Sequence, residues 1–415
     1  MSQPGAVIIG GYANGVSALR SVAREGVRTA VILTHRADIA HRSRYAHESH
    51  RVTGLHRRPD GLIDLLQEHA GRWGGWALIP TNDDALAALA EHRDLLSRWY
   101  PATIPPADVV QRVLHKPTTY RLAEELGIDV PRYYGSATRA TAARSDIIYP
   151  VVVKPAGSSR SWRIFRRKLF VARNPLELVA VIDRVERAEV PADIFELVLG
   201  PDDGFYNYSV HLDRQGEPAA EFSFRTLRKS PPRFGDARAA VPAQLPELRE
   251  PTIALLRRIG WQGTASVEYQ RDPRDGRYRL MEITGRCFLS HGLATRSGVN
   301  YPLLTWLEYA RHQRVAAVSN GWRGTWLHLH SDLFYRAFEP GGHDVTWREL
   351  ARSYSRPWID AVWSAADPAP FVSQCIGTLR KTAREIREGR EMDAVSTRLQ
   401  AMPHDIPTPL SPEAR

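Results

Sequence analysis

Lysine is scarce in this chain, so a lysine is a candidate for a position that needs a compact point charge, where arginine is a poor substitute. Lys154 ends the apolar run of residues 149–153, and a loop of small residues follows it at 155–159. A lysine that closes a buried strand and opens such a loop commonly holds a phosphate, because its compact charge and the loop's N–H groups can face one anion. We therefore predict phosphate contacts from Lys154 and from Gly157, Ser158 and Ser159. Of the 56 basic residues only five are lysine, namely Lys116, Lys154, Lys168, Lys229 and Lys381.

Two glutamates stand at equal sequence distance from the middle of a predicted hairpin. Strand-like runs at residues 265–270 and 277–283 flank a turn rich in Pro, Asp and Gly. If the turn centres on Asp275, Glu268 faces Glu282 across the strands. Opposed carboxylates destabilise a hairpin unless a cation lies between them, and hard oxygen ligands suit Mg²⁺. The opposite face is predicted to reach the core through Val267, Tyr269, Met281 and Ile283.

The residues after the second glutamate favour a metal site over the alternative, a hairpin whose two glutamates simply face water. Thr284 places a hydroxyl on the face of Glu282, and Arg286 adds a cation beyond it. Carboxylates and a cation at one end of a hairpin are what phosphoryl transfer requires. The prediction depends on the register, because a slip of one residue would remove the pairing.

The elements that must position these residues begin with alternating strands and helices. Strands are predicted at residues 6–9, 28–33 and 77–80, with helices between them, which indicates a parallel sheet covered by helices. Gly10 and Gly11 do not belong to a GxGxxG motif, so we interpret them as a tight turn. Asn82 and Asp83 follow the third strand. They either cap the next helix or hold a polar group of a substrate at the carboxyl edge of the sheet.

The proline-rich residues 101–106 mark the first predicted domain boundary. We predict an α/β domain at 1–110 and a strand-rich α+β domain at 111–315. A helical C-terminal extension is predicted at 316–415, and its polar, proline-bearing end after Pro403 is predicted to be a flexible tail.

Composition narrows the classes of function. The formal charge of +10 raises the question of nucleic acid, but the arginines are scattered and no basic tract with interleaved aromatics occurs, so we favour a solvated surface. No apolar stretch approaches the ~20 residues that span a bilayer. Cys287 and Cys375 form neither a disulfide framework nor a metal-ligand pattern, which makes the cytoplasm the expected compartment.

In chain order these motifs resemble the ATP-grasp superfamily. Single motifs are weak, but their order and spacing together are specific, and the resemblance extends to about residue 310. It implies a Rossmann-like pre-ATP-grasp domain followed by a two-lobed ATP-grasp domain, with ATP and Mg²⁺ as cofactors. The matching segments are residues 114–117, 152–155, 157–159, 195–200, 266–268, 281–286 and 298–302.

The resemblance assigns roles to the residues that would contact the nucleotide. Lys116 and Lys154 match the lysines that contact nucleotide phosphates. Arg286 matches the arginine that stabilises the phosphate during transfer. Glu196, Leu197 and Val198 match the hinge that reads the adenine edge. Either Asp202 or Asp203 matches the acid that binds the ribose hydroxyls.

The same resemblance assigns the metal ligands. Glu268 and Glu282 match the Mg²⁺ ligands, while Thr284 replaces the usual asparagine and puts the second metal site in doubt. A basic group lies between two strand-like segments, and we assign Arg225 within it a contact with the substrate carboxylate. The alternative for this group is a mobile surface loop. Its other members are Arg228, Lys229 and Arg233.

Residues 360–371 are similar to a carboxylate–amine-ligase-like subgroup related to biotin carboxylase. We predict an ATP-dependent ligase that activates a small carboxylic acid as an acyl phosphate and joins it to an amine or amino acid. One alternative is phosphorylation of an enol or bicarbonate oxygen, as in imine-forming or carboxylating relatives. Another is a basic nucleotide- or nucleic-acid-binding protein without catalysis. The expected partners are small molecules rather than nucleic acid or membrane, and a homodimer is left open.

Overall fold

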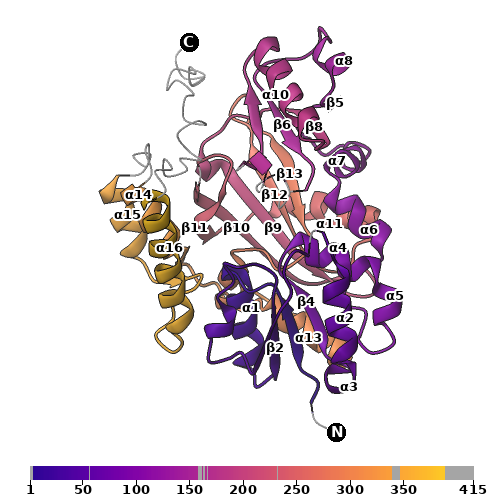
Figure 1. Ribbon diagram of the computed structural model, residues 1–415, viewed down its shortest axis with the longest axis vertical. Helices are drawn as coiled ribbons and strands as arrows, with labels where there is room; N and C mark the ends of the chain where they lie inside the picture. Colours follow the sequence, from indigo (N-terminus) through magenta and orange to yellow (C-terminus); the bar gives the residue numbers. More distant parts are fainter. Residues whose placement is uncertain are drawn as a thin grey trace.

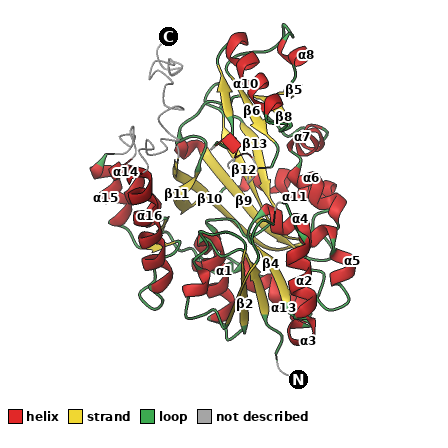
Figure 2. Ribbon diagram, viewed as in Figure 1, coloured by secondary structure: helices red, strands yellow, loops and turns green. Residues whose placement is uncertain are grey.

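The computed structural model describes residues 3–55, 57–157, 161, 164–165, 167–230, 232–338 and 346–387. Its strands form three sheets surrounded by helices (Figure 1). Figure 2 shows the same chain by element type, with mixed α/β content throughout. The predicted loop residues Ser158 and Ser159 and the predicted tail lie outside the described residues.

The N-terminal sheet is parallel, as predicted, with the order β3-β2-β1-β4. Every residue of β1, β2 and β4 is buried, which explains why their sequences are apolar apart from Thr29 at the start of β2. The prediction missed β3, because its residues Glu-Ser-His-Arg are polar and it forms the edge of the sheet. The elements are β1 (Ala6–Ile9), α1 (Ala13–Ala23), β2 (Thr29–Leu33), η1 (Ala40–Arg42), β3 (Glu48–Arg51), α2 (Asp60–Glu68), α3 (Ala70–Trp73), β4 (Ala77–Pro80), α4 (Asp83–Glu91) and α5 (Arg93–Leu96).

A second, antiparallel sheet has the order β5-β8-β6-β7. It has its own core, in which β6 and β8 pack with the helix α10. Two helices, α6 (Ala107–Leu114) and α7 (Lys116–Glu124), lead into it. Its elements are β5 (Tyr133–Ser136), α8 (Arg139–Ala142), β6 (Val151–Pro155), β7 (Phe170–Ala172), α10 (Pro175–Arg187) and β8 (Ala192–Glu196).

The largest sheet has the order β13-β12-β9-β10-β11-β14-β15. The strands from β13 to β14 pair antiparallel, and β15 pairs parallel with β14. Its elements are η2 (Asp202–Gly204), β9 (Phe205–Leu212), β10 (Pro218–Ser230), β11 (Asp236–Pro242), η3 (Pro246–Leu248), α11 (Arg249–Ile259), β12 (Gly263–Arg271), β13 (Tyr278–Thr284), α12 (His291–Arg296), α13 (Tyr301–Arg311), β14 (Thr325–Leu327) and β15 (Trp358–Asp360).

The C-terminal part contains α14 (Leu329–Phe338), α15 (Trp347–Tyr354) and α16 (Ala369–Arg387). It is not wholly helical as predicted, because β14 and β15 extend the large sheet from the edge strand β11. These strands are only three residues long, which is too short for their alternation to be recognised in the sequence. The sheet therefore ties this part to the rest of the chain.

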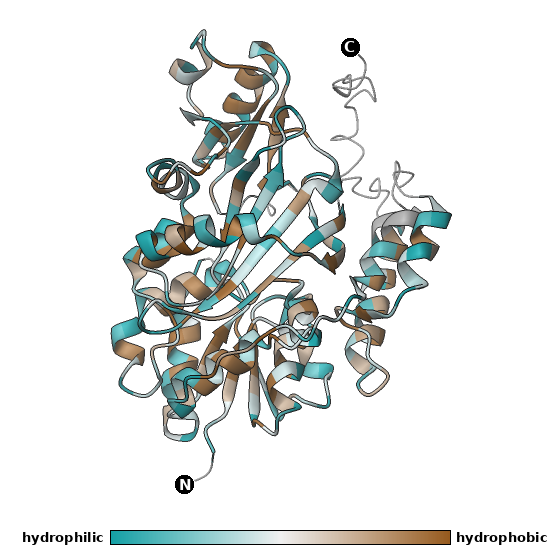
Figure 3. Cartoon of the chain, turned by 180° about the vertical axis from the view of Figure 1, so that it is seen from behind, coloured by the Kyte–Doolittle hydropathy of each residue, from teal (hydrophilic) through white to brown (hydrophobic). Residues whose placement is uncertain are grey.

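Alternate residues of β1 join two different cores. Val7 and Ile9 pack into a cluster that includes Val267 and Ile283 of the β12–β13 hairpin, so one core connects the N-terminal sheet to that hairpin. Ala6 and Ile8 belong to the other cluster, together with aromatic residues of β10. Figure 3 shows both hydrophilic and hydrophobic residues along the surrounding helices, as expected for helices that pack on one side. No helix of the described residues has the length and apolarity needed to cross a membrane.

Candidate active site

The predicted pairing of the two glutamates is present. Glu268 of β12 lies opposite Glu282 of β13, and Val267 lies opposite Ile283 on the buried face. A register shift follows directly, so that Tyr269 pairs with Leu280. Leu280 therefore takes the core position predicted for Met281, which is only partly buried. A β-bulge of this kind cannot be recognised from alternation alone.

Each glutamate has a lysine partner. Lys116, at the start of α7, donates to Oε2 of Glu282 over 2.9 Å and to the carbonyl oxygen of Met281 over 3.0 Å. The charge of Lys116 lowers the pKa of Glu282 to about 2, against the opposing effect of burial. Burial lowers the pKa of Lys116, but Glu282 and Tyr120 outweigh it and raise that pKa to about 12. Both side chains are therefore charged at neutral pH.

Lys229 binds the other glutamate. The sequence predicted it only as part of a basic group for a substrate carboxylate or of a mobile surface loop, and the loop is wrong for this residue, because Lys229 lies buried on β10. Its Nζ lies 3.2 Å and 3.4 Å from the carboxylate oxygens of Glu268. It also lies 3.5 Å from the centre of the Phe205 ring, and only 6% of its side chain is exposed. The scarcity of lysine was a signal for this residue, but nothing in the sequence linked it to Glu268.

Lys154 lies on β6 near these groups without pairing to any of them. Among the described residues its ammonium makes no ion pair, and it lies 5.6 Å from the centre of the Phe195 ring. Burial and the charge of Lys116 lower its pKa to about 7, although Glu282 and Glu268 oppose the shift. An anionic ligand would reverse this effect by stabilising the ammonium form.

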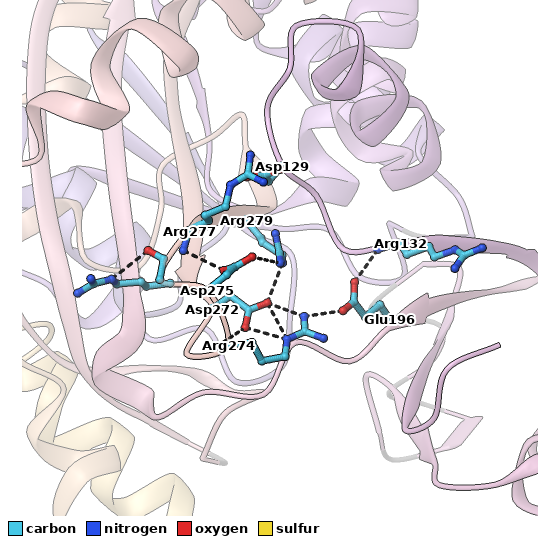
Figure 4. A network of polar contacts seen from close by, with 10 residues as sticks. Asp129, Arg132, Glu196, Asp272, Arg274, Asp275, Arg277 and Arg279 are labelled. Atoms are coloured by element: carbon cyan, nitrogen blue, oxygen red, sulfur yellow. Dashed lines mark hydrogen bonds and ion pairs between the residues drawn. The ribbon is translucent and has the colours of Figure 1, made fainter. Parts of the chain in front are cut away.

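The predicted hinge lies at the end of β8, and Figure 4 shows the network around it. The Glu196 carboxylate accepts from the backbone N–H of Arg132 over 3.1 Å and from Arg274 over 2.5 Å. Arg274 also binds Asp272, which is fully buried. This chain of contacts joins β8 of the small sheet to the β12–β13 turn of the large sheet. Leu197 and Val198 follow as buried residues, and adenine contacts there stay a prediction.

Two predicted acids already have protein partners. Asp202 accepts from the backbone N–H groups of Lys229 over 2.8 Å and of Arg233 over 2.5 Å, so it fixes the end of β10. Burial raises the pKa of Asp202. Asp203 lies 3.9 Å from Arg225. Contacts of these acids with a ribose, and of Arg225 with a substrate, stay predictions.

Arg286 connects the hairpin to the N-terminal sheet. Its Nε donates to Asp83 over 2.8 Å. Burial lowers the pKa of Arg286, but Asp83 and Glu282 outweigh it and the net shift is upward. The side chain of Asn82 accepts from the N–H of Ala85 and so caps α4, as one of the two predicted interpretations requires.

A cavity of about 1040 Å³ lies between the carboxyl edge of the N-terminal sheet and the large sheet. Of the predicted site residues, Glu268, Glu282, Thr284 and Arg286 line it, whereas Lys116, Lys154 and Glu196 do not. Asn207, which pairs with Glu268 across β9, is a lining residue that the prediction missed, because the β9–β12 pairing was not predicted. Further lining residues are Gly10, Gly11, Asn82, Asp83, Lys168, Lys229 and Asp236.

Two further polar residues have structural partners. Lys168 donates to Asp236 over 3.0 Å, and this ion pair raises the pKa of Lys168. His291 is fully buried with its Nε2 3.1 Å from the carbonyl oxygen of Asn14, and burial lowers its pKa to about 4. His291 is therefore neutral near pH 7 and belongs to the packing of α12 against α1, not to an exposed loop.

The two opposed glutamates fit Mg²⁺. In the described residues no group of three or more His, Cys, Asp or Glu side chains is placed to hold a metal ion alone. Mg²⁺ commonly takes one or two carboxylates and completes its coordination with substrate phosphates and water. Glu268 and Glu282, facing each other on one sheet surface, supply that donor set.

The sequence of this chain is similar to that of a ligase and of two synthase large chains. No protein-family model matches the chain. The chain is 21% identical to a D-aspartate ligase of Enterococcus faecium over 60% of its own length and 63% of that protein. It is 26% and 22% identical to carbamoyl phosphate synthase large chains of Methanobrevibacter smithii and Myxococcus xanthus, over 43% and 70% of its length. It spans only 17% and 27% of those two chains, and so less than two thirds of all three relatives.

Solved structures resemble the chain over a larger share. An L-amino acid ligase from Bacillus licheniformis has a TM-score of 0.57 at 16% identity and covers 77% of this chain and 76% of its own. An N5-carboxyaminoimidazole synthetase from Staphylococcus aureus has a TM-score of 0.59 at 15% identity, covering 83% and 88%. The biotin carboxylase domain of a Hydrogenobacter thermophilus carboxylase, in complex with MgADP and bicarbonate, has a TM-score of 0.60 at 17% identity, covering 78% and 74%. This chain therefore shares its fold with these ligases and carboxylases, which agrees with the predicted resemblance to the ATP-grasp superfamily.

Proposed function

We propose that this protein is an ATP-dependent ligase that activates a small carboxylic acid and joins it to an amine. The observation that carries the proposal is the pair Glu268–Glu282. The two carboxylates face each other, each bound by a lysine, on the wall of a cavity large enough for small-molecule substrates. The ligases among the similar proteins support the same assignment.

The nucleotide phosphates are assigned to the lysines around this pair. Lys154 and Lys116 provide positive charge, and the loop at Gly157 provides backbone N–H groups. Mg²⁺ held by Glu268 and Glu282 would neutralise phosphate charge and align the reacting oxygens. Arg286 lines the same cavity as Glu282, where it can stabilise charge on the phosphate during transfer.

The organic substrates are assigned to the cavity beyond Glu282. The acid must bring an oxygen to within about 3–3.5 Å of the terminal phosphorus, so its site lies towards the N-terminal sheet. The carboxyl ends of β1 and β4 form the opposite wall, with Gly10, Gly11 and Asp83. There the acyl phosphate forms with release of ADP, and the amine then displaces phosphate.

A screen of phosphate release across carboxylic acids and amino acids tests the proposal. ADP formation that requires one acid and one amine together, with a product mass equal to their sum less water, is the expected result. Salt-sensitive binding to DNA or RNA without any nucleotide turnover would instead support a non-catalytic binding protein and overturn the proposal.

A second candidate function changes only the acceptor. The TM-scores of 0.60 and 0.59 to a biotin carboxylase domain and an N5-carboxyaminoimidazole synthetase are as high as that to the amino acid ligase. They favour phosphorylation of a bicarbonate or enol oxygen. Turnover that depends on bicarbonate, and incorporation of labelled bicarbonate into product, would distinguish this reaction from amide formation.

A further inference from the structure

A buried carboxylate in the C-terminal part lies behind the candidate site. Asp332 of α14 is fully buried, and both of its oxygens accept from Arg228 of β10, over 3.0 Å and 2.7 Å. It also accepts from the hydroxyl of Tyr354 over 3.3 Å and lies 3.7 Å from Arg238 of β11. One carboxylate thus connects α14 and α15 to two neighbouring strands of the large sheet. Figure 1 shows α14 and α15 at this side of the sheet.

The sheet contacted by Asp332 is irregular at this point. The β10–β11 register shifts between Thr226 and Arg228 and again between Arg228 and Lys229. Irregular pairing does not fix the direction of a side chain as a regular ladder does. Other contacts must therefore hold Lys229, whose ammonium lies beside Glu268.

Asp202 accepts from the backbone N–H of Lys229, and the other contacts around this main chain lead back to Asp332. Arg228, the preceding residue, is bound by Asp332 and donates to Ser353 over 2.8 Å. Arg238 donates its Nε to the carbonyl oxygen of Lys229 over 2.7 Å. Arg228 thus points to the C-terminal helices while Lys229 points into the cavity, and both side chains are buried.

We propose that Asp332 is a positioning residue, which fixes Arg228 and Arg238 and thereby places the ammonium of Lys229 beside Glu268. A buried ion pair often contributes no more stability than apolar residues of similar size, so stability alone does not account for this arrangement. What the pair adds is a defined direction, because a bidentate arginine–carboxylate contact fixes both partners. Asp332 does not line the cavity itself. The C-terminal part is thereby required for the geometry of a site that Asp332 does not touch.

The direct test observes Lys229 without relying on activity. Protein labelled with ¹³C and ¹⁵N in lysine gives signals from only five side chains. Lys229 lies over the Phe205 ring, so its side-chain signals carry a ring-current shift, and Lys229→Arg identifies them. Asp332→Asn is expected to move the Lys229 signals and to leave those of Lys381 unchanged. Lys229 signals that stay in place in a folded Asp332→Asn protein would overturn the proposal.

A matched control comes from the same C-terminal part. Asp360 accepts from the backbone N–H of Leu329 over 2.6 Å, at the start of α14, and from the backbone N–H groups of Val362 and Trp363, so it holds main chain at the other end of this part. Asp360→Asn is expected to lower the thermal stability and to leave the Lys229 signals in place. If Asp332→Asn does not fold, the double variant Arg228→Met/Asp332→Leu replaces the ion pair with apolar groups, and the same shift of Lys229 is expected in it.

The kinetic test rests on the proposed ligase function. Asp332→Asn is expected to lower kcat by about 10- to 100-fold, since a displacement near 1 Å can cost about that much, with KM for ATP changed less than about 2-fold. In a Lys229→Met background, Asp332→Asn should cause no further loss of kcat, because both substitutions remove the same contribution, that of the Lys229 ammonium. An equal loss in both backgrounds would assign Asp332 a general structural role. Absence of turnover in the parent protein would count against the ligase function only, because the lysine signals still decide the positioning role.

Discussion

At the scale of single residues, the site depends on two carboxylates that face each other, each with a lysine beside it. Glu282 stays charged because Lys116 lies 2.9 Å away, and Glu268 has Lys229 at 3.2 Å. These ion pairs offset the repulsion expected between opposed carboxylates in a sheet. Mg²⁺ would compete with the lysines for the carboxylate oxygens, so the lysines would become available for phosphate contacts as the metal binds.

Glu282→Gln removes the charge but keeps the shape of the side chain. We expect ADP formation to fall by at least about 100-fold, because charge stabilisation at the phosphate is lost, while the circular dichroism spectrum stays that of the parent. Parent-like rates of ADP formation in this variant would contradict the assignment of Glu282 as a metal ligand.

Lys154 leads to a prediction about pH. Its pKa of about 7 in the free protein means that it is largely neutral at pH 8, and phosphate contact favours its charged form. ATP binding at pH 8 should therefore take up a proton, and ATP affinity should fall as the pH rises above about 7. Calorimetry in buffers of different ionisation enthalpy measures the uptake.

The variants Lys154→Ala and Lys381→Ala form a matched pair for this prediction. Lys381 lies on α16, on the exposed surface, and does not line the cavity. Lys154→Ala should bind ATP more weakly and lose the proton uptake, whereas Lys381→Ala should keep both. Equal ATP affinity in the Lys154→Ala protein and the parent would count against phosphate contact.

At the scale of elements, the β12–β13 turn carries a contact between two sheets. Arg274 binds the buried Asp272 within the turn and reaches Glu196 at the end of β8 (Figure 4). The contact thereby sets the spacing between the small sheet, which holds Lys154, and the large sheet, which holds the two glutamates. A nucleotide bound between them would depend on this spacing.

Arg274→Met should therefore raise the dissociation constant of ATP by roughly 10-fold, with kcat at saturating ATP nearly unchanged, because the contact is remote from the transferred phosphate. Arg271→Met serves as its control, because Arg271 bonds only the nearby carbonyl of Gly276 within the described part of the turn. A fall in kcat at unchanged affinity would show that Arg274 acts on the chemistry and not on nucleotide binding.

At the scale of the whole molecule, the cavity has walls from all three thirds of the described chain, at residues 10–84, 168–237 and 266–290. Asp83 and Arg286 are 203 residues apart in sequence and form an ion pair across one wall. The shared core that connects β1 with the hairpin keeps these walls together. Under the proposed function, binding of the organic substrate and stabilisation of the phosphate would be linked through Asp83.

Asp83→Asn should raise KM for one organic substrate and leave KM for ATP unchanged. We also expect Asp83→Asn to lower kcat, because Arg286 loses its carboxylate partner and its fixed direction. Initial-rate kinetics with each substrate varied in turn measures all three. Unchanged kinetics for every organic substrate would show that Asp83 only begins helix α4.

The sequence by itself determined the local features of this protein. Equal spacing about Asp275 was enough to predict that Glu268 faces Glu282, because a hairpin pairs residues close in sequence. Buried strands such as β1 were evident from their apolar runs, and the order of short motifs indicated the fold.

The tertiary structure alone determines which lysines pair with the two glutamates. Lys116 is 166 residues from Glu282, and Lys229 is 39 residues from Glu268. Spacing along a chain carries no information about such contacts, which the packing of separate sheets creates. For the same reason the sequence could not predict that Leu280, and not Met281, faces the core. Nor could it predict the contacts of Asp332 behind Lys229. A bulge and a buried ion pair each depend on partners that other elements supply.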